Sequence, residues 1–236
     1  MLSKISNISF KSTPLYGVKI KKRDEGNTYK NVDAIFSVLN PDDKNDIKAV
    51  RKVGRRWWRT KYTNLIRNDF RFKMLSPYLT FYALELKGSE PLDKRIVSLC
   101  EVSKSPFDYP GCYVNFLQAS PEALREKNPK YKGSGEVTLY GVVREAKKDH
   151  IKHIKLTSND KSSMFYKHIG FKPEGFLGDY ALYSQGYKRY ISRVENKYNF
   201  WFYIKYIYKI LLLYLCLIFV NDYYHWIMFE LQNLVY

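Results

Sequence analysis

The spacing of apolar residues in the first third of the chain changes between the periods of a strand and of a helix. Residues 15–20 read as a short strand, followed by a basic patch and the turn-forming run 24–27. Apolar residues then recur at helical spacing over 31–39 and again over 46–72. The pattern predicts one strand and then two helices, and Gly54 is expected to bend or split the second helix.

The middle of the chain has the pattern of a small antiparallel sheet. Runs rich in aromatic and aliphatic residues are separated by Gly and Pro clusters. They predict three antiparallel strands, at residues 78–86, 95–102 and 113–118.

Helical and strand patterns alternate after this sheet. We expect a helix over 135–148, a strand over 151–157, and a helix that Asn159 or Asp160 caps and that runs to residue 169. Two closing strands follow at 171–176 and 180–183. This order predicts an α+β fold with a mixed sheet in one domain, residues 1–190.

The composition changes sharply in the C-terminal extension, residues 191–236. Between residues 200 and 220 the only charges are Lys205 and Lys209. About 20 apolar residues can span a bilayer as a helix. Aromatic residues flank the run and most cations precede it, which predicts a membrane anchor with the domain of residues 1–190 in the cytoplasm. The alternatives are a buried or peripheral helix and a tail without a selected role.

The charge balance points to a polyanionic ligand, because 40 Lys and Arg face 23 Asp and Glu and give a formal net charge of +17. The three cysteines, Cys100, Cys112 and Cys216, are scattered. Their spacing argues against a disulfide framework or a zinc site and favours a reducing compartment. The N-terminus lacks the pattern of a secretory signal, so export through a cleaved signal is not expected.

A glycine-rich turn, KYKGSG from Lys130 to Gly135, directly precedes a predicted helix. Glycines allow successive N–H groups to converge, and the helix adds its positive end, so the turn suits a phosphate. It lacks the Walker pattern, and Thr138 stands where the dinucleotide fingerprint requires its third glycine. The kinase and dehydrogenase readings are thereby excluded.

The turn and the segments after it resemble the GNAT superfamily of acetyl-CoA-dependent N-acetyltransferases. The residues that carry the resemblance are KYKGSG, then EVTLYGVVREAKK, HIKLTSN and KSSMFYKHIGFK. It implies a three-layer α/β/α sandwich around a mixed sheet of six to seven strands, which splays open between 113–118 and 151–157 to admit acetyl-CoA. Lys130 replaces the usual Arg or Gln, and Glu136 would repel diphosphate if it turned toward it.

The resemblance also implies roles for individual residues. Main-chain groups of Phe116, Leu117 and Gln118 would bind the pantetheine arm. The pyrophosphate would be held by Lys130, Lys132, Gly133, Ser134 and Gly135. Asn159 would touch the cofactor, and Tyr166 would protonate the departing thiolate of coenzyme A; the alternative for Tyr166 is a packing aromatic.

The general base is open between several carboxylates. Glu85 and Glu101 on predicted strands and Asp108 in the next loop can each accept a proton from an amine, and water can replace them. Strand carboxylates are more often solvated or paired. No metal site is expected, because His150 and His153 would lie on opposite faces of a strand.

The most basic segment, residues 48–73, interleaves cations with Trp and Tyr. Three interpretations are open: a core helix whose cationic face is solvent-exposed, an acidic or nucleic-acid partner, and contact with anionic lipid. The chain is therefore interpreted as an N-acyltransferase that moves an acyl group from acetyl-CoA to an amine on a small molecule, peptide or protein. The alternative is a catalytically inactive GNAT-fold module that binds nucleic acid or an anionic membrane through this helix.

Overall fold

The computed structural model describes residues 13–60, 62–72, 78–104, 111–125, 127–175 and 178–198. The strands are β1 (Thr13–Arg23), β2 (Tyr29–Leu39), β3 (Leu79–Leu86), β4 (Ile96–Lys104), β5 (Gly111–Ala119), β6 (Tyr131–Lys132), β7 (His153–Thr157), β8 (Lys172–Glu174) and β9 (Asp179–Tyr183). The helices are α1 (Lys44–Arg56), α2 (Thr63–Arg71), α3 (Leu92–Arg95), α4 (Ser134–Lys148), α5 (Asp160–His168) and α6 (Ser184–Tyr198).

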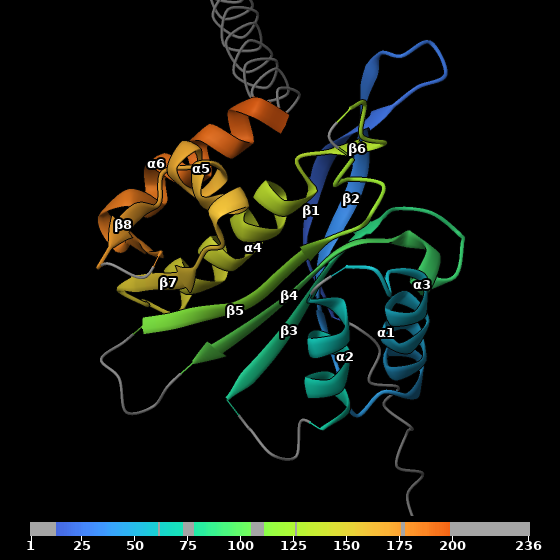
Figure 1. Cartoon of the computed structure of the whole chain (residues 1–236), viewed down its shortest axis with the longest axis horizontal. Helices are drawn as coiled ribbons and strands as arrows, with labels where there is room; N and C mark the ends of the chain where they lie inside the picture. Colours follow the sequence, from blue (N-terminus) through green and yellow to red (C-terminus); the bar gives the residue numbers. More distant parts are fainter. Residues whose placement is uncertain are drawn as a thin grey trace, which may run out of the picture. The chain divides into compact units, whose positions relative to one another are not determined.

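The described strands form one mixed sheet in the order β6-β1-β2-β3-β4-β5-β7-β9-β8 (Figure 1). Only β5 and β7 pair in parallel, and all the other neighbours are antiparallel. The predicted α+β class is confirmed. The sheet has nine strands rather than six to seven, because β2 and the two-residue β6 were not predicted.

Residues 31–39 were predicted as a helix, and this prediction is wrong. They belong to β2, which pairs with β1 on one side and β3 on the other. Their apolar side chains at 32, 34, 36 and 38 recur at every second position, the period of a strand. Nine residues are too few for the apolar pattern alone to separate the two periods. Pairing with two strands, which leaves Phe36 without exposure, decides for the strand.

The predicted second helix is split, but not at Gly54. The break is the turn between Trp57 and Tyr62, where α1 ends and α2 begins. Gly54 lies inside α1, where a Cβ atom would come 2.7 Å from Cδ of Arg67 on α2. The glycine therefore permits close packing of α1 and α2.

Two apolar cores lie on opposite faces of the sheet. One packs α4, α5 and α6 against it and includes Phe36, Tyr140 and Tyr187. The other packs α1 and α2 and includes Trp57 and Phe81. Helices on both faces give the predicted three layers (Figure 1).

The helix α6 was not predicted, although its buried residues Tyr187, Tyr190, Val194 and Tyr198 follow helical spacing. It packs on α4 and crosses residue 190, where we predicted the end of the domain; that division stays a prediction. The predicted membrane helix at 200–220 lies outside the described residues. No helix within the described ranges is long and apolar enough to cross a membrane.

Candidate active site

The sheet opens between β5 and β7, as the resemblance implies. The two strands pair only from Gly111 to Val114 of β5 against His153 to Leu156 of β7. Beyond Val114, β5 continues to Ala119 paired with β4 alone among the described strands. The main-chain groups on the β7 side of this half of β5 are therefore available to a ligand.

A β-bulge lies at the start of the unpaired half of β5. The register with β4 passes from Val102–Val114 to Glu101–Phe116, which leaves Asn115 as the extra residue. The Nδ2 of Asn115 donates to Oε1 of Glu101 at 2.8 Å. The bulge thus aims an amide at a buried carboxylate, and the sequence analysis missed Asn115.

The side chains of this half of β5 divide between the two cores. Phe116 packs on the α1–α2 side, where its ring centroid is 5.6 Å from that of Tyr62. The Oε1 of Gln118 accepts from the Tyr62 N–H at 3.4 Å. Leu117 packs on the opposite side, against the α4–α5–α6 core. The three predicted cofactor-binding residues therefore line both faces of the opening.

The glycine-rich turn begins α4 beside the same opening. Gly133 has φ 84°, a left-handed conformation that favours glycine, and it is the N-cap of α4 without a side-chain cap. A Cβ on Gly135 would lie 3.9 Å from Leu117 and 3.7 Å from Phe165 of α5. The turn, β5 and α5 thus meet at one place, and the uncapped N–H groups of the first turn of α4 suit an anion.

The two lysines of the turn contact protein groups. Lys130 Nζ lies 3.4 Å from Oε2 of Glu122, and Lys132 Nζ lies 3.9 Å from the ring centroid of Tyr29. Lys132 also belongs to β6, which pairs with β1. Because both lysines already contact protein groups, the main-chain N–H groups are the hydrogen-bond donors that this turn most readily offers to an anion.

Glu136 does not face the turn as an uncompensated charge. Its side chain is buried and accepts from Lys197 Nζ at 2.6 Å, Tyr198 Oη at 2.9 Å and Arg193 Nη2 at 3.4 Å. All three donors come from α6. The helix that the sequence analysis missed therefore neutralises the carboxylate that would otherwise repel diphosphate.

Tyr166 lies on α5 among aromatic rings and is 8% exposed. Burial, with smaller effects of Cys100 and Tyr62, raises the pKa of its hydroxyl above the ordinary value. The phenol is therefore protonated at neutral pH and can donate its proton.

Asn159 is the N-cap of α5, as predicted for Asn159 or Asp160. Its Oδ1 accepts from the Ser162 N–H at 2.9 Å, and its Nδ2 lies 3.4 Å from Oη of Tyr62. The residue thus links α5 to α2 across the opening of the sheet.

The two candidate bases differ in their surroundings. Both oxygens of Glu85 are occupied, since Oε1 accepts from Ser37 Oγ at 2.6 Å and Oε2 lies 2.7 Å from Arg95 Nη1. Glu101 is 2% exposed, and its Oε2 is buried without a hydrogen-bond partner in the described part of the chain. Asp108 lies outside the described residues.

Burial raises the pKa of Glu101 to about 7, against the lowering effect of the Asn115 hydrogen bond. A smaller contribution comes from Asp69 of α2, a second carboxylate beside it. Two carboxylates can hydrogen bond only when one of them carries a proton. Glu101 can therefore gain and lose a proton near neutral pH, as a general base requires.

Tyr62, Asp69 and Asn115 are the site residues that the sequence analysis missed. Tyr62 and Asp69 lie in the basic segment, where aromatic residues were read as core. Asn115, a polar residue inside an apolar strand, is the only one of the three whose position in the sequence indicated an irregularity.

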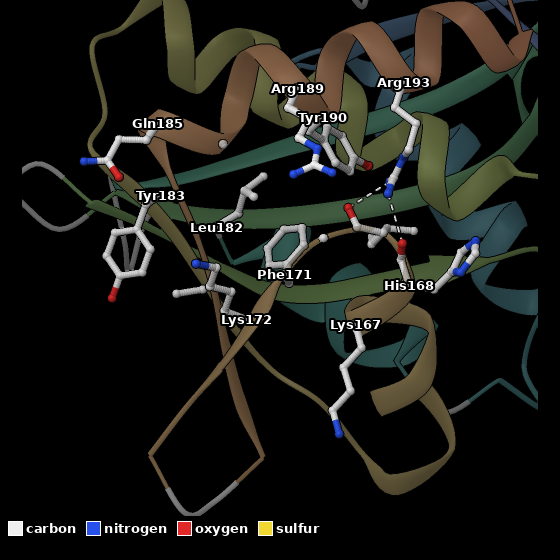
Figure 2. A pocket seen from close by; sticks show the side chains of 14 residues that line it. Lys167, His168, Phe171, Lys172, Leu182, Tyr183, Gln185, Arg189, Tyr190 and Arg193 are labelled. Atoms are coloured by element: carbon white, nitrogen blue, oxygen red, sulfur yellow. Dashed lines mark hydrogen bonds between the residues drawn. The ribbon is translucent and has the colours of Figure 1, made fainter.

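A separate cavity of about 850 Å³ lies between the end of α5, β8–β9 and α6 (Figure 2). Its lining includes Lys167, Lys172, Arg189 and Arg193, and the described residues that line it include no Asp or Glu. Phe171 lines it, and the ring centroid of Phe171 is 6.0 Å from that of Tyr166. The cavity is therefore next to the core around Tyr166 but is formed by other elements than the opening of the sheet.

No family model matches the sequence, and no curated protein matches it either. Solved structures do match. The AtaTR complex bound with AcCoA aligns at TM-score 0.50 and 16% identity over 66% of this chain and 96% of that chain. A putative GNAT acetyltransferase from Desulfovibrio desulfuricans aligns at TM-score 0.47 and 15% identity, covering 64% and 98%. GCN5 from Tetrahymena aligns at TM-score 0.45 and 12% identity, covering 63% and 94%. At these identities the similarity shows the architecture, and the chain has the fold of the GNAT acetyltransferases.

Proposed function

We propose that the protein is an N-acyltransferase that moves an acetyl or related acyl group from acetyl-CoA to an amine in a ternary complex. One observation carries the proposal. At the unpaired half of β5, a buried carboxylate that titrates near neutral pH and a buried, protonated phenol lie on opposite sides of the sheet. Glu101 is on the side of α1 and α2, and Tyr166 is on the side of α4 and α5.

Binding of the donor would use the groups around the opening. Main-chain groups of Phe116, Leu117 and Gln118 pair with the pantetheine arm, and the N–H groups at the start of α4 hold the pyrophosphate. Acetyl-CoA supplies the acyl group as a thioester. Asn159, at the start of α5, borders the same opening.

Two separate proton transfers would then take place, one on each side of the sheet. Glu101 accepts the proton of the attacking amine at Oε2, the oxygen that Asn115 does not occupy. Main-chain N–H groups of β5 stabilise the negative charge on the carbonyl oxygen. Tyr166 gives its proton to the leaving sulfur. Glu85, with both oxygens occupied, is the less suitable base.

Titration calorimetry of the full chain with acetyl-CoA is the first test. Saturable binding is expected, and its absence would remove the proposal.

Replacing Tyr166 with Phe tests the acid. The substitution keeps the packing of the ring and removes the proton, so kcat should fall by about 10²-fold while acetyl-CoA affinity stays nearly unchanged. Thiol release with an accepted amine gives the rate, and calorimetry gives the affinity. Tyr180→Phe is the matched control, because its hydroxyl already has a partner in Ser163 Oγ at 2.7 Å. Equal rates for the Tyr166 variant and the wild type would show that Tyr166 only packs.

The second candidate is an inactive module of the same fold that binds a polyanion through α1. The observation that favours it is the row of exposed cations on this helix, and such a row is compatible with an active enzyme as well.

A further inference from the structure

We propose that the outer face of α1 and the turn after it form a docking surface for a single-stranded segment of nucleic acid. Its cations, here called the basic face, are Lys48, Arg51, Lys52, Arg55, Arg56 and Arg59. The proposal concerns binding alone and does not depend on acyl transfer.

The basic face follows the period of the helix. Its members recur at intervals of three and four residues, so they form one stripe along α1, and all of them are exposed. The opposite face of α1 is buried in the core, with Val50 and Val53 at 1% and 0% exposure. The stripe therefore faces away from the sheet and contributes nothing to the core.

Few partners within the protein neutralise this stripe. Lys52 Nζ lies 3.5 Å from Asp93 Oδ1, and Arg56 Nη2 lies 3.4 Å from the Ile96 carbonyl. In the described part of the chain, no carboxylate pairs with Arg51, Arg55 or Arg59. The two acidic residues within α1 and α2 are not available on this surface. Asp46 is 1% exposed, and Asp69 lies beside Glu101.

The repeated cations weaken the isolated helix. Like charges four residues apart repel, and Lys48 with Lys52, Arg51 with Arg55 and Lys52 with Arg56 are such pairs within α1. Among the residues of these pairs, the described part of the structure gives only Lys52 a carboxylate partner, Asp93, whereas a row of phosphates would neutralise all of them. Arginine predominates, and its guanidinium suits phosphate oxygens.

An exposed aromatic ring in the turn after α1 adds a feature that phosphate binding alone does not need. Trp58 is 62% exposed, with Cζ of Arg59 4.9 Å from its ring centroid. A ring supported by a guanidinium and open to solvent can stack on a base. Stacking requires an unpaired base, which favours a single strand over a duplex.

The same arrangement disfavours the other polyanions. A helix that lies on a membrane inserts its apolar face into the lipid. The apolar face of α1 is occupied by the protein core, and the large apolar residue that α1 exposes, Ile47, is only 37% exposed. An acidic protein partner would be expected to meet an interface with an apolar centre. The basic face has no such centre.

Fluorescence anisotropy of the full chain with labelled single strands of about 16 nucleotides tests the proposal. We expect saturable binding that weakens steeply between about 50 and 200 mM salt. The double substitution R51Q/R55Q should weaken binding at least tenfold and reduce the slope of log K against log salt by about 2. The matched control K167Q/K172Q removes the same charge from the cavity of Figure 2 and should change the affinity less than threefold.

The aromatic part has a test of its own. Trp58→Ala should weaken binding of single strands about tenfold and leave binding of a duplex of the same length within twofold. Parallel measurements with RNA and DNA strands identify which of the two is bound more tightly, and either supports the proposal.

Three results would overturn it. The first is the absence of binding to single strands. The second is an equal loss in both double variants, which would indicate diffuse attraction by net charge. The third is binding to vesicles of anionic lipid that R51Q/R55Q abolishes and that oligonucleotides fail to displace. Far-UV circular dichroism and thermal melting of each variant confirm that the fold is retained.

Discussion

Replacing Glu101 with Gln is expected to lower kcat by about 10²- to 10⁴-fold while making the protein more stable above neutral pH. Both effects have one origin, because in the proposed mechanism the buried carboxylate must be ionised to accept the proton. Gln is nearly isosteric, so its oxygen can still accept from Asn115 and its amide can donate to Asp69. The Glu101→Gln variant therefore loses the proposed general base but keeps the contacts of the side chain with its neighbours.

The pH dependence of the stability gain follows from the pKa of Glu101, which is raised in the folded protein from 4.5 to about 7. Below pH about 4.5 both the folded and the unfolded chain bind the proton, and Glu101 costs nothing. As the pH rises from about 4.5 to about 7, the unfolded chain releases the proton while the folded chain still holds it, so the folded state loses stability, and above 7 the loss is complete. This pKa difference corresponds to on the order of 3 kcal/mol of unfolding free energy at pH 8, which is an upper value for the stability gain of the Glu101→Gln variant.

Thermal melting at pH 4 and pH 8 measures the gain, and thiol release measures the rate. The variant should melt higher than the wild type at pH 8 and at the same temperature at pH 4, and the wild-type kcat/KM should rise with pH through about 7. The control is Glu85→Gln, which leaves Arg95 without its buried partner and should destabilise the protein. A gain for Glu101→Gln that is equal at both pH values would contradict the raised pKa.

Replacing Gly133 with Ala is expected to destabilise the protein by about 2–4 kcal/mol and to abolish measurable acetyl-CoA binding. The left-handed conformation at φ 84° costs an alanine about 1–2 kcal/mol. The new Cβ would also lie 2.1 Å from Oη and 2.6 Å from Cζ of Tyr198, so the ring must move. That movement breaks the hydrogen bond from Tyr198 to Glu136, worth about 1 kcal/mol.

Chemical denaturation gives the stability of this variant, and calorimetry with acetyl-CoA gives its affinity. Gly26→Ala is the matched control, since nothing lies within 4 Å of its Cβ position and its φ is not in the left-handed region; its effect should stay within about 0.5 kcal/mol. The double variant with Tyr198→Ala should cost less than the sum of the two single changes, because the clash disappears. Strictly additive costs would show that Gly133 and Tyr198 are not coupled.

The sequence pattern predicted correctly those elements whose structure depends on residues close in the sequence, such as helix caps and glycine turns. The helix α4 has its glycine turn, and α5 has its cap at Asn159, so both were predicted close to their observed bounds. The strand β2 was mistaken for a helix because its identity depends on partners on either side. The polar composition of α6 concealed its stripe of buried tyrosines, which becomes apolar surface only when α4 lies against it.

In the candidate site, too, only the features that depend on neighbouring residues could be predicted from the sequence. The glycine turn and Tyr166 are recognisable from neighbouring residues. The environment of Glu101 is not, because Asp69 is distant in the sequence and Asn115 approaches through a bulge. Likewise, Glu136 could be recognised as a charge beside the turn, but its three donors come from a helix about 60 residues later.

The contact between Tyr198 and Gly133 has a practical consequence for shortening the chain. A cut before the apolar extension, for example after Glu195, looks harmless in the sequence. It would delete Lys197 and Tyr198, two of the three donors to Glu136, and leave that carboxylate beside the glycine-rich turn with Arg193 alone. We therefore expect a shortened protein to bind acetyl-CoA poorly for a reason unrelated to membranes, so a trimmed version that tests the proposed activity has to retain Tyr198.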